Sequence, residues 1–234
     1  MFQDVKYIFF DVGNTLTYPN YSRVLEPLSR SNVSPSAQQW AAVERDCKRE
    51  LDKIVEHGGI VDHGYWTTFY VRLLGLLGMD DPLLTDQLVA ASRASESWNR
   101  TRPGTRQALL QIGERYRLGA ISNSDGKVRQ LLTAVGIADC FSTITDSGIV
   151  GCEKPDPRIF KRAVERCSSL ASKTMFVGDH PEIDIQGAKG AGLVPVWKAV
   201  PYWQVSSDVL TINNLSELLS LTTSSDLLPN SFPR

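Results

Sequence analysis

The sequence predicts an α/β fold, with a parallel sheet covered by helices on both faces and an additional all-helical segment inserted after the first strand. Three observations support this prediction. Short apolar runs alternate with amphipathic helical patterns, which is typical of a parallel sheet. A block at residues 18–100 carries helical patterns only. The first apolar run, Tyr7–Phe10, ends on a carboxylate, Asp11, followed by the turn-forming residues Gly13 and Asn14.

Five apolar runs are expected to be strands, and the third of them is the weakest. They are residues 7–10, 118–121, 143–145, 175–177 and 193–197. Two helices between them are indicated by apolar residues at spacings of three and four, one from Val128 to Val135 and one from Ile159 to Cys167. Gly136 and Gly192 are suited to end helices. A short closing helix is predicted around Leu215–Leu219.

The helical block contains three apolar stripes, which we interpret as the packing faces of a helical bundle. The stripes are Trp40, Val43, Cys47, Leu51 and Ile54; Trp66, Phe69, Tyr70, Leu73, Leu74 and Leu77; and Leu84, Leu88, Ala91 and Trp98. We therefore predict that residues 1–17 and 101–221 form the sheet unit, that residues 18–100 form the helical unit and that residues 222–234 are a loosely ordered tail. Residues 17–21 are expected to link the units and to line the entrance to a site.

Composition argues against several classes of partner. The chain has 234 residues and a net charge of −1, which gives no electrostatic reason to expect nucleic acid or an anionic membrane as a partner. The basic run from Arg45 to Arg49 is interrupted by an acid and is interpreted as a solvated helix face. The four cysteines form no CxxC pair and are expected to be free thiols, which favours a cytoplasmic location. The sequence leaves the oligomeric state open.

Polar segments whose side chains could bind ligands or react lie where the predicted strands end or where loops begin. Asp11 ends the first strand, Ser122 and Asn123 follow the second, Lys154 precedes a helix, and Asp179 follows the fourth strand. In open α/β sheets, ligands bind beyond the carboxyl ends of the strands. We therefore expect these side chains to converge at one edge of the sheet.

Together these residue types suit phosphoryl transfer. A carboxylate such as Asp11 can attack phosphorus and form an aspartyl-phosphate. Mg²⁺ prefers carboxylate and water oxygens, which Asp11 and Asp179 can supply. A lysine and a hydroxyl, here Lys154 and Ser122, can hold the oxygens of the phosphoryl group. Each motif alone has an ordinary structural explanation, such as a turn or a helix cap, and only the combination is specific.

Four segments, FFDVGNTL, ISNS, EKPDP and VGDHPEID, resemble in order and context the motifs of the haloacid dehalogenase-like (HAD) hydrolases. The helical block between the first two resembles the helical cap of that family. The resemblance implies a Rossmann-like core, a mobile cap and, most commonly, Mg²⁺-dependent phosphatase activity on a small phosphorylated metabolite. It implies specific roles for matching residues: Asp11 as nucleophile and metal ligand, Ser122 and Asn123 as phosphate-binding residues, Lys154 as the stabiliser of negative charge, Asp179 as metal ligand, and Asp184 as support for the metal's water shell or for Lys154.

One position departs from the family pattern. Phosphatases of the family usually carry a second Asp two residues after the nucleophile as general acid and base, and this chain has Gly13 there. The backbone carbonyl of Gly13 can still ligate Mg²⁺, because the family uses a main-chain oxygen at this place. Loss of a general acid costs on the order of 10²- to 10⁴-fold in rate.

Three functions remain open from the sequence. The first, which we favour, is a slow or specialised phosphatase that acts on substrates with good leaving groups, such as acyl or aryl phosphates, or that uses His57, His63 or His180 in place of the missing acid. The second is a metal-independent 2-haloacid dehalogenase, a class that also lacks the second Asp, although Asp179 argues against it. The third is a catalytically silent relative that binds a ligand or a protein.

Overall fold

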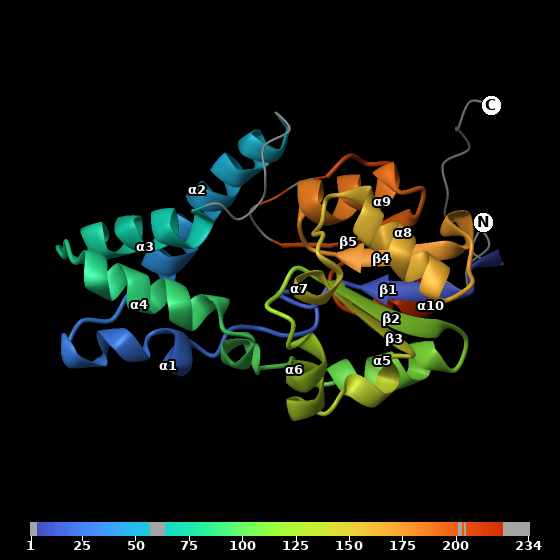
Figure 1. The fold of residues 1–234 in the computed structure, drawn as a ribbon, viewed down its shortest axis with the longest axis horizontal. Coiled ribbons are helices and arrows are strands. Elements are labelled where there is room, and N and C mark those ends of the chain that lie inside the picture. Colours follow the sequence, from blue (N-terminus) through green and yellow to red (C-terminus); the bar gives the residue numbers. More distant parts are fainter. Residues whose placement is uncertain (1–3, 57–63, 201–202, 204, 222–234) are drawn as a thin grey trace.

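The computed structural model describes residues 4–56, 64–200, 203 and 205–221. The expected tail at residues 222–234 and the histidines at positions 57 and 63 lie outside these residues. Two groups of elements are visible in Figure 1: a sheet with helices on both sides, and a set of helices that projects from the carboxyl end of its strands. Among the described residues, no helix is both long enough and apolar enough to cross a membrane.

The sheet is parallel throughout, with the strand order β3-β2-β1-β4-β5-β6. The strands are β1 (Tyr7–Phe10), β2 (Arg117–Ser122), β3 (Thr143–Asp146), β4 (Thr174–Gly178), β5 (Val194–Lys198) and β6 (Leu210–Ile212). The predicted α/β class and the five predicted strands are confirmed. The edge strand β6 was not predicted, because its middle residue, Thr211, is polar and exposed and interrupts the apolar run.

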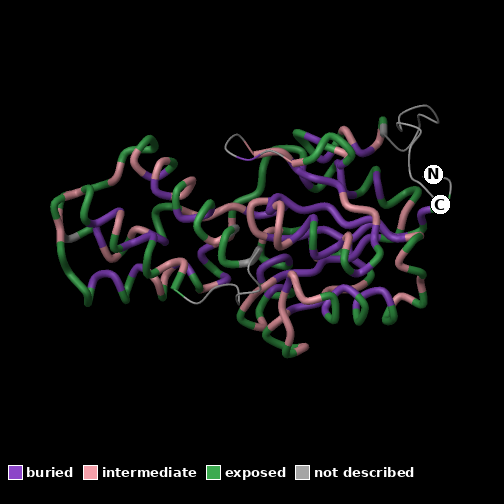
Figure 2. Tube along the Cα trace, turned by 90° about the horizontal axis from the view of Figure 1, so that it is seen from above, coloured by how far each residue is buried: buried purple, intermediate pink, exposed green. Residues whose placement is uncertain are grey.

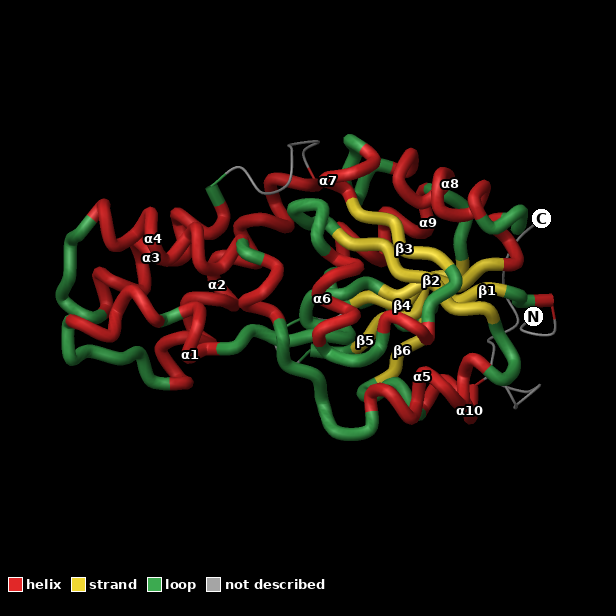
Figure 3. The backbone as a smooth tube through the Cα atoms, turned by 60° about the horizontal axis from the view of Figure 1, so that its bottom comes forward, coloured by secondary structure: helices red, strands yellow, loops and turns green. Residues whose placement is uncertain are grey.

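Strand β1 is central, and both of its faces are buried. Ile8 and Phe10 belong to the apolar cluster beneath helices α5 (Thr105–Gly113), α6 (Val128–Ala134) and α10 (Glu217–Leu221). Tyr7 and Phe9 belong to the cluster beneath α8 (Pro157–Arg166) and α9 (Gly187–Gly190) on the opposite face. The two layers of helices are separated by the strands in Figure 3. This double burial explains why the strand reads as a continuous apolar run.

The projecting helices have an apolar cluster of their own. They are α1 (Tyr21–Val24), α2 (Ala37–Glu56), α3 (Tyr65–Leu76) and α4 (Pro82–Arg93). A further short helix, α7 (Ser147–Val150), belongs to the sheet unit instead. Trp40, Phe69 and Tyr70 are at the centre of this cluster, and the Trp40 and Phe69 rings are 4.7 Å apart. Figure 2 shows buried segments in both groups of elements. We call residues 18–100 the helical insert.

Two details of the predicted stripes are wrong. Trp98 is not on the third helix, because α4 ends at Arg93, Ala94 is extended and Trp98 belongs to a separate 3₁₀ turn, Ser95–Trp98. Ile54 is 49% exposed and does not contribute to the packing face of α2. The basic run on α2 is also not uniformly solvated, because Lys48 is buried. Both Trp98 and Lys48 line the cavity described below.

Candidate active site

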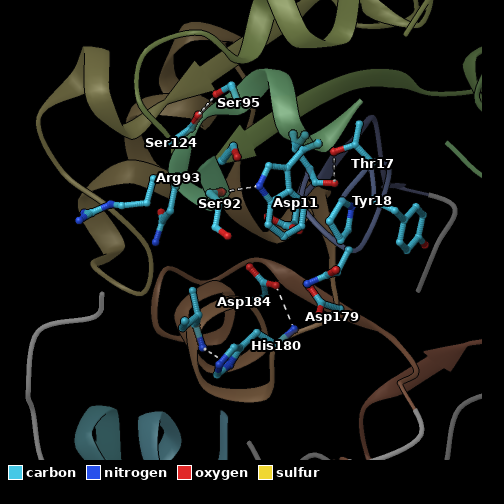
Figure 4. A pocket seen from close by; sticks show the side chains of 18 of the residues that line it. Asp11, Thr17, Tyr18, Ser92, Arg93, Ser95, Ser124, Asp179, His180 and Asp184 are labelled. Atoms are coloured by element: carbon cyan, nitrogen blue, oxygen red, sulfur yellow. Dashed lines mark hydrogen bonds between the residues drawn. The ribbon is translucent and has the colours of Figure 1, made fainter. Parts of the chain in front are cut away.

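Four predicted segments line one cavity of about 660 Å³ at the carboxyl ends of the strands. The cavity is bounded on one side by the sheet unit and on the other by the helical insert. Figure 4 shows Asp11, Asp179 and Asp184 pointing toward its interior. Asp11, Ser122, Asn123, Lys154, Asp179 and Asp184 all belong to its lining. The structure therefore brings these six candidate side chains together, while His57 and His63 lie outside the described residues.

Asp11 is held directly beyond the central strand. The backbone N–H of Asp11 donates to the carbonyl of Val177 on β4, at 2.8 Å, which fixes the first residue after β1 against the neighbouring strand. Gly13 forms a bridge with Thr17, and Asn14 adopts a left-handed conformation with φ of 60° between them. This tight turn returns the chain toward the helical insert and leaves Asp11 at the floor of the cavity.

Lys154 joins two buried carboxylates. Its Nζ donates to Asp11 Oδ1 and to Asp184 Oδ1, each at 2.6 Å, and its side chain is 2% exposed. Although burial opposes protonation, the charges of Asp11 and Asp184 raise the pKa of Lys154. The ammonium therefore stays charged and fixes the orientation of both carboxylates.

Asn123 positions the backbone of Lys154. The Asn123 side-chain amide donates to the Lys154 carbonyl at 2.8 Å and accepts from the Lys154 N–H at 2.7 Å. Its side chain is thus committed to joining the loop after β2 to the loop before α8. The predicted role of Asn123 in binding phosphate stays a prediction, while Ser122 is buried at the end of β2 and lines the cavity.

Asp184 approaches the chain so closely that only glycine fits opposite it. A Cβ at Gly178 would lie 2.5 Å from the carboxyl group of Asp184. The second oxygen of Asp184 accepts the N–H of His180 at 3.0 Å, so both of its oxygens are used. Asp184 is carried by a π-helical turn, Pro181–Gln186. Its hydrogen bonds make it a support for Lys154.

Burial dominates the acid–base properties of the two other carboxylates. Burial raises the pKa of Asp11 to about 6, against the opposing effect of Lys154. Burial likewise raises the pKa of Asp179 to about 7, opposed by Lys48 and assisted by Asp11 and Asp184. Asp11, Asp179 and Asp184 offer oxygen atoms that all lie within 4.8 Å of one another. Such a cluster is costly without a cation to neutralise it.

The helical insert contacts the site at three places. Lys48 of α2 lies with its Nζ 4.0 Å from Asp179 Oδ2 and 3.0 Å from Glu44 Oε1. Ser95 donates from Oγ to Asp125 and lies 3.1 Å from Ser124 Oγ, on the loop after β2. The Trp98 ring faces Gly13, where an added Cβ would lie 3.6 Å from it. The insert therefore covers the cavity in this structure.

Sequence reasoning did not identify several cations and aromatic rings that line the cavity, among them Arg93 and Trp66. Lys198 directly follows the predicted strand 193–197, so the rule that identified Asp11 would also have found it. Lys48, Arg102 and Trp98 come from helical or linking segments, where no periodic signal marks a cavity-facing side chain. His180 is buried, and burial, Lys48 and Lys154 together lower its pKa well below the usual value. A lowered pKa favours the neutral imidazole and so does not favour His180 as the general acid.

The family assignment follows from comparison with known proteins. Residues 5–192 match the haloacid dehalogenase-like hydrolase family, and the chain belongs to this family of hydrolases. A curated relative is the glyceraldehyde 3-phosphate phosphatase of Pyrococcus abyssi, which is 27% identical over 197 residues, 82% of this chain and 81% of the relative. The resemblance found in the sequence motifs is thereby confirmed.

Solved structures agree on the fold. The HAD hydrolase YfnB from Bacillus subtilis, solved with bound magnesium, has a TM-score of 0.76 at 20% identity and covers 94% of this chain and 99% of its own. The L-2-haloacid dehalogenase from Xanthobacter autotrophicus, solved with covalently bound chloropropionic acid, has a TM-score of 0.65 at 18% identity, with 94% and 99% covered. Because both identities are low, these likenesses establish the fold alone.

Proposed function

We propose that this protein is a Mg²⁺-dependent phosphatase that acts through an aspartyl-phosphate on a small phosphorylated metabolite. The observation that carries the proposal is the position of Asp11, which is buried at the end of the central strand, bonded to Lys154 and clustered with Asp179. The relative from P. abyssi is named as a phosphatase of a small sugar phosphate, which supports this class of substrate.

The donor set fits a magnesium ion. Lys154 occupies one oxygen of Asp11 and one of Asp184, and the N–H of His180 occupies the other oxygen of Asp184. The second oxygen of Asp11, the carboxylate of Asp179 and the backbone carbonyl of Gly13 are the ligands that we propose. An all-oxygen set with two carboxylates is what Mg²⁺ prefers. When bound, Mg²⁺ would neutralise the phosphate and the carboxylates around it.

The residues of the chain divide the reaction between them. A carboxylate oxygen of Asp11 attacks phosphorus, the bond from phosphorus to the leaving oxygen breaks, and the leaving group departs with the bonding electrons. Ser122 and Lys154 hold the phosphoryl oxygens, where charge accumulates. Water then attacks phosphorus, releases inorganic phosphate and restores the carboxylate of Asp11. Lys154 remains protonated throughout.

The place beside Gly13 provides no acid for the leaving group. The Trp98 ring faces this residue, and the indole Nε1–H of Trp98 donates to the Ser92 carbonyl at 2.8 Å, which fixes the ring. The leaving group must therefore depart without protonation by a side chain at position 13. We infer that substrates with acidic leaving groups, such as acyl and aryl phosphates, react best.

A series of phosphate esters with falling leaving-group pKa tests this proposal. With Mg²⁺ present, the logarithm of kcat/KM should rise steeply as the pKa of the leaving group falls, and EDTA should abolish turnover. The rate of phosphate release across the series is the measurement. Absence of turnover with every ester would contradict the proposal and favour a ligand-binding relative. Release of halide from 2-haloacids without metal would identify a dehalogenase, the alternative that the missing second Asp favours.

We also propose that residues 18–100 act as a cap that selects the substrate. The contact of Lys48 with Asp179 and the hydrogen bond from Ser95 to Asp125 join the insert to the loops that carry the proposed catalytic residues. Tyr18 and Arg100 exchange backbone hydrogen bonds of 2.7 and 3.2 Å where the two linking segments run side by side. Closure of the insert would exclude water from the attack on phosphorus.

Gly13→Asp is expected to restore general acid catalysis. An added Cβ is accommodated at this position, because the nearest atom to it is 3.6 Å away on the Trp98 ring. Hydrolysis of an alkyl phosphate should rise by about 10-fold or more, while hydrolysis of an aryl phosphate should change little. Steady-state kinetics with both esters are the measurement. Gly13→Asn is the matched control, and an equal gain in the Asn variant would contradict the explanation.

Magnesium should stabilise the protein more at pH 8 than at pH 5. Because burial raises the pKa of Asp11 to about 6 and of Asp179 to about 7, folding favours their protonated forms. The resulting stabilisation of the folded protein is complete below the usual pKa of Asp, and it is lost as the pH rises through the two raised pKa values. Mg²⁺ requires the ionised carboxylates, so at 100 times Kd it should add about 2.7 kcal/mol at pH 8. Thermal unfolding with Mg²⁺ and with EDTA at both pH values measures the difference, and equal shifts would argue against these ligands.

A further inference from the structure

Lys198 is a buried cation in the wall of the proposed active-site cavity. It is the last residue of β5, is 2% exposed and lines the same cavity as Asp11 and Asp179. An ammonium group is expensive to bury unless it is paired with an anion or fully hydrogen-bonded. The surroundings of Lys198 therefore need explanation.

Within the described part of the chain, the ammonium group of Lys198 has neither a hydrogen bond nor an ion pair. Its contact is with an aromatic ring, since Nζ lies 5.6 Å from the ring centroid of Tyr18. Tyr18 is half-buried and belongs to the segment that links β1 to the helical insert. A cation–π contact of this kind contributes about 0.5–2 kcal/mol, which is less than the cost of burying an unpaired charge.

A second cation faces the same ring. The Arg102 guanidinium carbon lies 4.8 Å from the Tyr18 ring centroid, and Arg102 also lines the cavity. Among the described residues no carboxylate lies within ion-pair distance of Arg102. Burial and then the charge of Arg102 lower the pKa of Lys198, and Asp179 and Asp11 oppose this effect only in part. Two like charges on one ring are stabilised if an anion binds beside them.

Two other lysines of the cavity are already compensated. Lys154 is bonded to Asp11 and Asp184, and Lys48 is bonded to Glu44 at 3.0 Å. Lys198 and Arg102 differ from both in having no carboxylate at ion-pair distance among the residues described, although the more distant Asp179 and Asp11 raise the pKa of Lys198 and Arg102 is exposed. Because the proposed Mg²⁺ would neutralise Asp11 and Asp179, the anion that best pairs with Lys198 and Arg102 is one supplied by the ligand.

We propose that Lys198 and Arg102 form a second anion-binding subsite, beside Tyr18, for a substrate that carries a carboxylate or a second phosphate in addition to the phosphoryl group that is cleaved. This inference rests on the proposed phosphatase function and narrows its substrate class. It also separates this chain from enzymes whose substrates carry one charged group. The subsite binds and orients the substrate and takes no part in the chemical step.

Equilibrium binding of unreactive phosphonates tests the subsite without turnover. The probes are 3-phosphonopropanoate, propane-1,3-diphosphonate and propylphosphonate, which share a phosphonate and a three-carbon frame, and titration calorimetry with Mg²⁺ present gives each Kd. At least one of the doubly anionic probes should bind about 10- to 100-fold more tightly than propylphosphonate, the range for hydrogen bonds to charged groups. The probe with the larger gain in affinity shows whether the subsite prefers a carboxylate or a second phosphate. Equal Kd values for all three would overturn the proposal.

Substitution of the two cations should remove this preference alone. Lys198→Met keeps the length of the side chain and Arg102→Gln keeps its polarity, and both should bring the doubly anionic probes to within about 3-fold of propylphosphonate, whose Kd should not change. Lys161→Met is the matched control, because Lys161 is exposed on α8 and outside the cavity lining. The unliganded Lys198→Met protein should unfold at the same temperature as the native protein or higher, because an unpaired buried charge is removed.

Kinetics then separate the two hypotheses. If 4-(carboxymethyl)phenyl phosphate and 4-methylphenyl phosphate, two aryl phosphates with similar leaving groups, are both hydrolysed with equal KM, the phosphatase function stands and the subsite is wrong. If no phosphate ester is hydrolysed but 3-phosphonopropanoate binds selectively and loses this selectivity in Lys198→Met, the subsite stands and the phosphatase function is wrong. A loss of affinity for all three phosphonates in Lys198→Met would place Lys198 at the phosphoryl group and overturn the proposal.

Discussion

Asp11→Asn should lower kcat by on the order of 10⁴-fold or more and leave the protein folded. The amide is a poor nucleophile, while its oxygen can still accept the hydrogen bond that Lys154 donates to Asp11 at 2.6 Å. Because burial raises the pKa of Asp11, removal of the charge should not lower the melting temperature at pH 8 in the absence of metal. Phosphate release from an aryl phosphate and thermal unfolding are the two measurements.

Trapping the intermediate distinguishes a nucleophile from a residue that only holds metal. The native protein, quenched in acid during turnover of a ³²P-labelled ester, should carry label on Asp11 that hydroxylamine releases, because an aspartyl-phosphate is an acyl phosphate. Asp86→Asn makes the same chemical change at an exposed position on α4 and should retain full activity and labelling. Residual labelling in Asp11→Asn, or an activity loss smaller than 10-fold, would contradict a nucleophilic Asp11.

The fold was largely predictable because each strand of the sheet centre is a buried apolar run. Strand β1 is covered on both faces, so its four residues contain no polar interruption. The edge strand β6 has three residues, one of them exposed, and offers no such signal. The end of α4 was missed because Trp98 falls at a helical spacing from Leu88 and Ala91, whereas the extended Ala94 breaks the helix. Periodicity alone does not detect a break of this kind.

The floor of the site was predictable and its cover was not. Residues such as Asp11 and Asp179 follow strands, and parallel topology brings strand ends together. Lys48 and Trp98 reach the cavity only because the helical insert folds back over the sheet, which is a tertiary arrangement with no local sequence pattern. The basic run around Lys48 therefore suggested a solvated face, although this lysine is buried near Asp179.

Lys154→Met should have the largest effect on stability in addition to abolishing activity. The substitution leaves the buried carboxylates of Asp11 and Asp184, each 2.6 Å from the lost ammonium, without their shared cation. Removal of one partner from a buried ion pair costs about 3–5 kcal/mol. The cost should be greater at pH 8 than at pH 5, because protonation of the carboxylates relieves it at the lower pH. Thermal or urea-induced unfolding at both pH values gives the difference.

The double variant Lys154→Met with Asp184→Asn provides the decisive comparison. Removing one of the two unpaired carboxylate charges should recover part of the lost stability at pH 8. Activity should stay absent, because the lysine that holds the phosphoryl oxygens is missing. Activity measured well below the melting temperature of each variant separates catalysis from unfolding. If Lys154→Met alone were as stable as the native protein at pH 8, the three side chains would not form the charged unit on which the proposed mechanism depends.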